Sequence, residues 1–202
     1  MQENKNYNAI TTRPDNKIAE NTDYAEIFFE IVEKRRSIRK YKPCDMPQED
    51  LKKILNAARL APSARNAQPW RFLVVKDQKM KEFIAKSIGP QDHFAEASAV
   101  IIVLGDQNIA PYWYLQDPMI AAEHLVLGAT ALGYGTCWIG ALADWVPENM
   151  AAVKQALKIP EEISIVCIIA IGVADEKPGA RPRNALREIC YEEVYGKPSN
   201  FL

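Results

Sequence analysis

The sequence predicts an α+β or α/β domain in which a central sheet is covered by helices. Apolar runs at 100–104 and 163–171 show no alternation, which indicates strands buried on both faces. Segments with helical apolar spacing lie before and between these runs, so helices should cover both sides of the sheet. The 202 residues suffice for one domain, expected at 23–202 after an N-terminal tail at 1–22 that we expect to be flexible.

The first two helices are expected at the start of this domain. One begins near Asp23, an acidic N-cap, and ends in the basic cluster 34–36, which complements the helix dipole. The other follows Pro47 and repeats apolar residues at i, i+3, i+4 and i+7 from Leu51 onward. It should stop before Pro62, whose ring cannot continue helical hydrogen bonding.

Strands and helices alternate through the rest of the chain. A strand is expected at 72–75 and a helix at about 79–87, ahead of the strand at 100–104. A helix should then start with Asp117 as N-cap and Pro118 at its first position, and end at Gly133 and Gly135. This helix is apolar on nearly every face, so its own domain or a second subunit must cover it all round. A helix at about 147–157 leads to the last strand.

The composition excludes several classes of function. Lys and Arg number 25 against 26 Asp and Glu, and the resulting net charge of −1 provides no field to attract nucleic acid or an acidic membrane. Every apolar stretch is broken by charge, Gly or Pro before it could span a bilayer. The four cysteines show no C-x-x-C spacing and are interpreted as reduced thiols. We therefore expect a soluble, cytoplasmic protein with no nucleic-acid or membrane partner.

Two arginine-rich segments are candidate anion sites. The segment 35–39 (Arg-Arg-Ser-Ile-Arg) offers three guanidiniums and a hydroxyl, which can neutralise and hydrogen-bond a phosphate. The segment 181–183 (Arg-Pro-Arg) offers two more guanidiniums at a spacing that proline makes rigid. Taken singly, a solvated helix end explains the first segment better than phosphate does, and a solvated tail explains the second about as well.

Two loops could present polar groups to a ligand. The segment 61–70 gathers short polar and amide side chains, which could face a flat heterocycle or could satisfy their own backbone. The segment 133–141 has three glycines, which permit either close backbone approach to a ligand or tight turns. It is not a G-x-G-x-x-G motif followed by a helix, so it does not indicate a dinucleotide fold.

The sequence contains no convincing protein-borne nucleophile or metal site. His93 and His124 lack a metal-ligand partner at helical spacing, and no Ser-His-acid or Cys-His arrangement is apparent. We therefore assign no catalytic residue and no metal. If the protein is an enzyme, a bound cofactor should carry the reactivity.

Taken together and in order, these segments resemble the FMN-dependent nitroreductase family from about residue 25 to the C-terminus. The resemblance implies an α+β fold around a mixed, mainly antiparallel sheet, in an intertwined homodimer with FMN at the subunit interface. The residues that it places at the FMN are Arg35, Arg36, Ser37, Arg39, Pro62, Ser63, Ala64, Asn66, Gln68, Ile139, Gly140, Arg181 and Arg183.

The resemblance also implies separate roles within this set. The phosphate would be held by Arg35, Ser37 and Arg183. Arg39 would reach the polar edge of the flavin or its ribityl chain and could stabilise the anionic reduced flavin. The segment 62–66 would come from the partner subunit, and residues 139–140 would place their backbone beside the ring near flavin N5.

The chemistry implied by the resemblance is two-electron transfer in two alternating half-reactions. NAD(P)H would give a hydride to flavin N5 and leave, and a nitroaromatic, quinone or similar small acceptor would take its place. Tyr112 and Trp113 lie between the second apolar run and the apolar helix. They could line the substrate pocket by stacking on planar acceptors or could equally plug the dimer interface.

Two alternatives remain open at this stage. A divergent relative could use the same flavin for another reaction, such as reductive dehalogenation or flavin cleavage. The short segment between Gly105 and Asp117 leaves little room for a substrate-closing lid, which argues against dehalogenation. A flavin-binding or storage protein without turnover would share the binding residues, so the sequence does not separate it from an enzyme.

Overall fold

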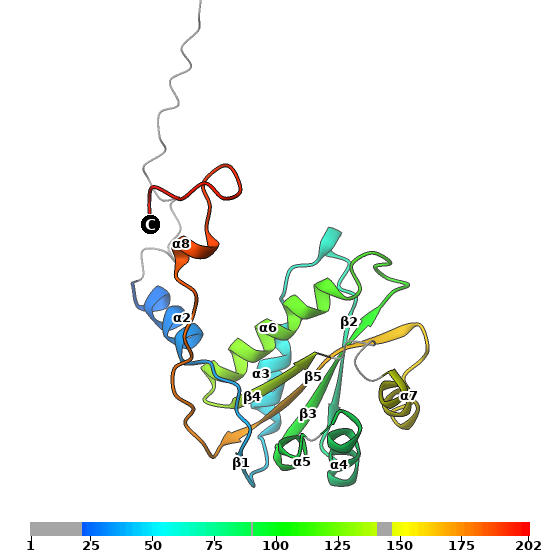
Figure 1. The fold of residues 1–202 in the computed structure, drawn as a ribbon. Coiled ribbons are helices and arrows are strands. Elements are labelled where there is room, and N and C mark those ends of the chain that lie inside the picture. The colour runs from blue at the N-terminus through cyan, green and yellow to red at the C-terminus, as the bar shows by residue number, and fades with distance from the viewer. Residues whose placement is uncertain (1–21, 90, 141–146) are drawn as a thin grey trace, which may run out of the picture.

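The computed structural model describes residues 22–89, 91–140 and 147–202 (Figure 1). Apart from Thr22, the N-terminal tail predicted at 1–22 lies outside these residues. The elements, in chain order, are α2 (Thr22–Lys34), β1 (Tyr41–Lys42), α3 (Gln48–Arg59), the 3-10 turn η1 (Ala64–Asn66), β2 (Trp70–Val75), α4 (Gln78–Ser87), α5 (His93–Glu96), β3 (Ala99–Asp106), α6 (Gln116–Ala131), β4 (Gly135–Gly140), α7 (Pro147–Ala156), β5 (Ile163–Ala174) and α8 (Leu186–Ile189).

The strands form one sheet in which every described strand pair is antiparallel. β5 lies at its centre, with β3 and then β2 on one side. Along its other edge β5 pairs first with β4, at residues 167–172, and then with β1, at 173–174. An isolated parallel bridge joins Ser37 to Thr136 on the outer edge of β4. The mainly antiparallel α+β architecture is therefore confirmed.

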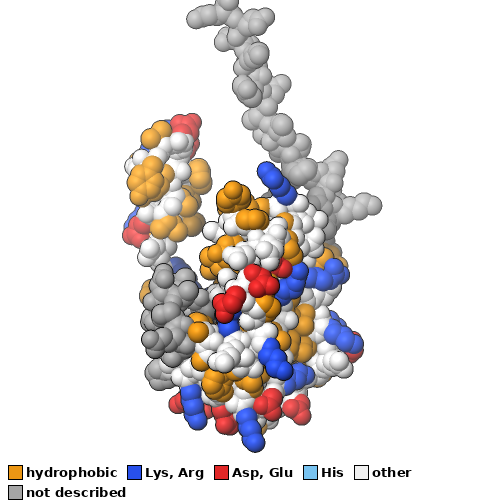
Figure 2. Space-filling model, turned by 90° about the vertical axis from the view of Figure 1, so that its right-hand side faces the viewer, with side chains coloured by type: hydrophobic (Ala, Val, Ile, Leu, Met, Phe, Trp, Pro, Cys, Tyr) orange, Lys and Arg blue, Asp and Glu red, His pale blue; other side chains and the backbone are white. Residues whose placement is uncertain are grey.

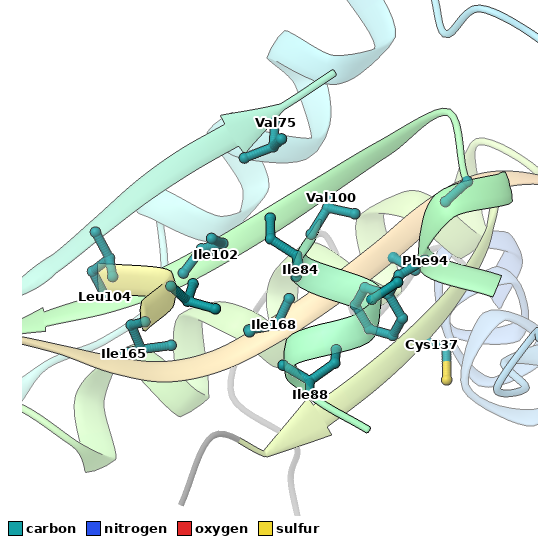
Figure 3. Close-up of a cluster of buried hydrophobic side chains, with 14 of the residues drawn as sticks. Val75, Ile84, Ile88, Phe94, Val100, Ile102, Leu104, Cys137, Ile165 and Ile168 are labelled. Atoms are coloured by element: carbon teal, nitrogen blue, oxygen red, sulfur yellow. The ribbon is translucent and has the colours of Figure 1, made fainter. Parts of the chain in front are cut away.

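Helices cover both faces of the sheet, as the two apolar runs predict. Val100, Ile102 and Ile168 lie on one face, within a core closed by α4, α5 and α7 (Figure 3). Ile101 and Ile169 alternate with them and lie in a second core, under α3 and α6. All five side chains are fully buried, and each contributes about 1.5–3 kcal/mol by leaving water.

The face of α6 that packs on the sheet is built from small and branched residues. Ala122, Leu125, Val126 and Ala129 are buried there, and a Cβ added at Gly128 would lie 3.1 Å from Ala57 Cβ in α3. The opposite face is open in this chain, since apolar side chains remain exposed at Met119, Ile120 and Leu132. The described residues therefore cover α6 on one side, whereas the sequence predicts that the helix is covered on all sides.

The predicted start of this helix at Asp117 and Pro118 is wrong. α6 begins at Gln116, and the N–H of Asp117 already donates to the carbonyl oxygen of Trp113 (3.0 Å). The preceding turns run directly into the helix, so there is no free end for Asp117 to cap. Instead its buried carboxylate accepts the N–H of Ala64, at 3.1 Å. Asp117 therefore stabilises the loop that contains Ala64 rather than the start of its own helix.

The prediction for the glycine segment after α6 is confirmed only in part. Gly133, with φ of +82°, does end the helix, but residues 135–140 form strand β4 rather than turns. A Cβ at Gly135 would lie 2.7 Å from Ile38 Cγ1, so glycine is needed there for close packing of two extended segments. The elements β1, α5 and α8 were not predicted, because two to four residues are too few for a periodic pattern.

Among the described residues, no helix combines the length and the apolar character needed to cross a bilayer. α2 contacts the end of α6, and the C-terminal segment with α8 extends away from the sheet (Figure 1). Both carry large hydrophobic side chains at their surfaces.

Candidate anion-binding site

The two arginine segments, far apart in sequence, meet in one cavity of about 270 Å³. It is lined by Arg35, Arg36, Ser37, Arg39, Glu176, Pro178, Arg181 and Arg183. Within the part of the chain that the structure describes, none of these five guanidiniums forms an ion pair. The five converging guanidiniums outnumber the single carboxylate of the lining and create a strong local positive potential in a chain of nearly zero net charge. The cavity therefore suits a compact, multiply charged anion such as a phosphate.

The first arginine segment is fixed against β4. The N–H of Ile38 donates to the carbonyl oxygen of Thr136 (2.8 Å), and the Ile38 side chain is buried in the core. Because side chains alternate along an extended segment, burial of Ile38 directs Ser37 and Arg39 toward the cavity. The position of the cationic side chains thus follows from one buried isoleucine and its fit against Gly135.

Arg36 differs from the other cavity arginines. Its Nη1 donates to the carbonyl oxygens of Glu33 (2.5 Å) and Arg35 (2.7 Å), at the C-terminal end of α2. Carbonyl groups at a helix end lack partners within the helix, and a guanidinium satisfies them well. Part of the Arg36 side chain therefore stabilises the end of α2. A role at the helix end is also what the sequence favours for the first arginine segment taken alone.

Glu176 is a cavity residue that sequence reasoning missed. It follows the end of β5, and its carboxylate accepts the backbone N–H of Arg39. One residue earlier, the N–H of Asp175 donates to the carbonyl oxygen of Lys40 (2.9 Å). The only signal in the sequence was an acidic residue between the last strand and the second arginine segment, which is common at strand ends.

Three titratable groups close to Arg39 are held neutral by burial. Burial raises the pKa of the Cys137 thiol and of the Tyr41 phenol, and Arg39 only partly opposes these shifts. Burial lowers the pKa of His93, and Arg39 adds to this shift. A buried thiol with a raised pKa is a poor nucleophile, so the structure does not favour a nucleophilic role for Cys137. The charge of the cavity is that of its guanidiniums and Glu176.

The loop 62–68 lies outside this cavity. Arg65, Asn66 and Gln68 adopt left-handed backbone conformations, with φ of 54°, 55° and 52°. Each costs about 1 kcal/mol or more for a residue with a side chain. Side-chain contacts that hold the loop include two from the N–H groups of its backbone: Ser63 Oγ accepts the N–H of Gln68 (3.0 Å), and Asp117 accepts the N–H of Ala64. Strain of this kind is typical of segments whose shape serves a ligand.

The same loop borders a second, more apolar cavity of about 250 Å³. Its lining combines Ala64, Arg65 and Ala67 with the segment 109–113. Tyr112 is 85% exposed and Trp113 is 50% exposed, so neither aromatic ring is buried within this chain. The structure thus places the two predicted pocket aromatics beside the predicted ligand loop. Pro62, Ser63, Asn66 and Gln68 do not line either cavity.

Ile139 and Gly140 are the last two residues of β4 and are half-buried. None of the described residues lies within 4 Å of a Cβ added at Gly140. The following residues, 141–146, lie outside the described part of the chain.

The largest described cavity, about 1140 Å³, lies elsewhere, around β1, α4 and α5. Its lining contains three lysines and three carboxylates, so its charges balance, and none of the predicted site residues borders it. The buried ammonium of Lys81 donates there to the carbonyl oxygen of Ala97 (2.6 Å). Charge convergence therefore singles out the smaller arginine cavity.

A helix-covered antiparallel sheet with an arginine-lined cavity defines an α+β protein equipped to bind an anion. Comparison with known families makes the assignment specific. The model of the nitroreductase family matches residues 32–91 and 85–173, and the chain belongs to this family.

Relatives and solved structures agree with this assignment. A protein of Archaeoglobus fulgidus, provisionally named NADH dehydrogenase/NAD(P)H nitroreductase, is 38% identical over 73% of this chain and 86% of its own length. The structure of an FMN-dependent nitroreductase from Clostridium difficile superimposes with a TM-score of 0.75 at 31% identity, covering 82% of this chain and 99% of that one. An iodotyrosine deiodinase of Thermotoga neapolitana is 25% identical over 79% of this chain and 95% of its own length.

Proposed function

We propose that the protein is an FMN-dependent oxidoreductase that passes a hydride from NAD(P)H to nitroaromatics, quinones or similar small acceptors. The observation that carries the proposal is the meeting of both arginine segments in one cavity. An enzyme of the NAD(P)H nitroreductase type is also what the names of the relatives describe.

The cavity residues fit the phosphate of FMN. Arg35, Ser37 and Arg183 would hold it with charge-assisted hydrogen bonds, and Arg181 and the free part of Arg36 would add positive charge. Arg39 would reach the polar edge of the flavin, where a cation stabilises negative charge. When bound, FMN supplies the chemistry of accepting a hydride from NAD(P)H and giving it to an acceptor in a second half-reaction. The protein contributes binding, orientation and charge.

We further propose a homodimer with FMN at the interface. Within one chain, the loop 62–68 does not border the arginine cavity, so a second copy would have to bring this loop to the flavin. Large hydrophobic side chains lie at the surface, including on a lobe that stands apart from the body of the molecule (Figure 2). The exposed hydrophobic side chains of α2 and the C-terminal segment are Tyr24, Ile27, Phe28, Phe29, Val32, Leu186, Ile189, Tyr191, Val194, Tyr195, Phe201 and Leu202. Apolar surface of this extent typically marks an interface.

The four cysteines are all free thiols, which agrees with the reducing cytoplasm in which we place the protein.

Anaerobic reduction of the purified protein tests the proposed activity. The protein should contain FMN, and NADH or NADPH should bleach its visible flavin absorbance. Addition of a nitroaromatic or a quinone should then restore the absorbance, because each half-reaction is complete before the next begins. A control sample to which no NADH or NADPH is added should keep its flavin absorbance.

Each alternative has a distinct outcome in this experiment. A flavin that nicotinamides never bleach would favour a flavin-binding or storage protein. A flavin that is bleached but reoxidised only by an iodinated or otherwise halogenated aromatic would favour a dehalogenating relative. Failure to bind FMN at all would contradict the proposal.

Trp113→Ala is expected to change acceptor preference without loss of FMN. Removal of a stacking surface from the apolar cavity should lower kcat/KM for a nitroaromatic by about fivefold. The value for ferricyanide, which does not stack, should stay unchanged. Leu115→Ala, which truncates an exposed side chain of the same segment outside the cavity, is the matched control. Dissociation into monomers or loss of flavin in Trp113→Ala would instead identify Trp113 as an interface plug.

A further inference from the structure

The arginine cavity contains one carboxylate among its described lining residues, that of Glu176. A negative charge in a site for an anion opposes binding, so its presence calls for a physical reason. Its contact with Arg39 supplies one. The half-buried carboxylate accepts the Arg39 N–H across a separation of 137 residues.

This contact ends a short antiparallel ribbon. Tyr41 and Lys42 pair with Ala174 and Val173, and beyond that register the N–H of Asp175 donates to the carbonyl oxygen of Lys40. At the next position the backbone ladder stops, and the Glu176 side chain takes the place of a backbone acceptor. The first arginine segment is therefore anchored on two sides, by Thr136 of β4 and by Glu176.

Glu176 also stands where the chain leaves the sheet toward the second arginine segment. Pro178, Arg181 and Arg183 follow within seven residues and line the same cavity. One hydrogen bond therefore connects the backbone of the first arginine segment to the start of the chain segment that carries the second. Loss of this bond would let the two groups of guanidiniums separate.

We propose that Glu176 is a positioning residue that holds the two arginine segments together and, through its charge, limits the affinity of the cavity for a dianion. This inference rests on the proposed binding of the FMN phosphate. The two effects have opposite signs, so they can be separated by substitution.

The charge effect has a calculable size. A roughly spherical cavity of 270 Å³ is about 8 Å wide, and a carboxylate and a dianion at that separation repel each other. The repulsion lies between its value at an effective dielectric constant of about 20, which applies near a protein surface, and its value in bulk water at about 80. Toward the aqueous end, which suits an open cavity, it corresponds to roughly a tenfold change in affinity. The hydrogen bond from the Arg39 N–H to the Glu176 carboxylate should raise the affinity by a similar factor, because it holds the first arginine segment in place.

Three substitutions distinguish these effects by FMN titration of the flavin-free full-length protein. Glu176→Gln keeps an acceptor of the same length and removes the charge, so FMN should bind about tenfold more tightly. Glu176→Asp keeps the charge but is one methylene shorter and loses the anchor, so FMN should bind about tenfold more weakly. Glu176→Ala removes both and should lie between these two variants, near the wild type. Glu162→Gln, an exposed change of the same charge outside the cavity, should have no effect.

Riboflavin and inorganic phosphate complete the experiment. Riboflavin lacks the phosphate, so the gain in Glu176→Gln should disappear with it, which a merely structural role of Glu176 would not produce. Weaker or unchanged FMN binding in Glu176→Gln, or unchanged binding in Glu176→Asp, would overturn the inference while leaving the proposed function intact. If the wild type binds no FMN, the proposed function fails, and the same ordering measured by thermal shift with inorganic phosphate decides the role of Glu176.

Discussion

Simultaneous replacement of Arg35 and Arg183 by alanine is expected to weaken FMN binding by about a thousandfold. The two guanidiniums reach the same cavity from opposite ends of the folded chain. Each charge-assisted hydrogen bond to a phosphate contributes about 1.5–3 kcal/mol, so loss of both should cost roughly 4 kcal/mol, which is about a thousandfold in affinity. Fluorescence titration of the flavin-free protein with FMN measures the change.

The matched control is the double variant Arg59→Ala, Lys79→Ala, which removes the same charge from exposed positions outside the cavity and outside the C-terminal segment. It should bind FMN as the wild type does. Titration with riboflavin should show little difference between the two double variants, because riboflavin has no phosphate. Equal FMN affinity in both double variants would mean that the cavity does not hold the phosphate.

Gly105→Ala is expected to destabilise the fold by about 3 kcal/mol or more. Gly105 lies in the central part of the sheet, and a Cβ there would stand 1.8 Å from the carbonyl oxygen of Tyr114. No side-chain rotation relieves a clash with backbone, so the segment that carries Tyr112 and Trp113 must move. Asp117 would move with it and release the loop that it holds through Ala64.

Urea unfolding of the flavin-free protein measures this loss. Gly140→Ala is the control for stability, since no described residue lies within 4 Å of the methyl group that it would add at the end of β4. Its unfolding midpoint should be equal to or above that of the wild type, because alanine has less conformational freedom than glycine in the unfolded chain. A midpoint for Gly105→Ala that is also unchanged would show that the Tyr114 segment can shift at no cost.

The buried part of the fold was predictable because its signals are local and repeated. The uninterrupted apolar runs indicated strands covered on both faces, and the pattern beginning at Leu51 predicted α3, which begins directly after Pro47 and ends three residues before Pro62. The strand β4 was missed because its apolar signal is short and its glycines usually mark turns. Gly135 is there for close approach to Ile38, and that contact is visible only in three dimensions.

The candidate site was predictable in composition but not in assembly. The arginine segments attract attention as clusters, whereas a lone Glu176 or Asp117 has many ordinary explanations in a sequence. Asp117 followed by proline matches a helix start so well that its contact with the distant loop could not be inferred. Residues whose partners lie tens of positions away leave no periodic trace, and both of these residues are of that kind.

The convergence of the two arginine segments has a consequence for chain entropy. An anion gripped from both directions acts as a non-covalent crosslink that closes a loop comprising most of the folded polypeptide. A ligand that binds only the native state also stabilises it by mass action. Binding of the anion and the free energy of unfolding are then linked. In a cell with little of the ligand, the protein would unfold more readily.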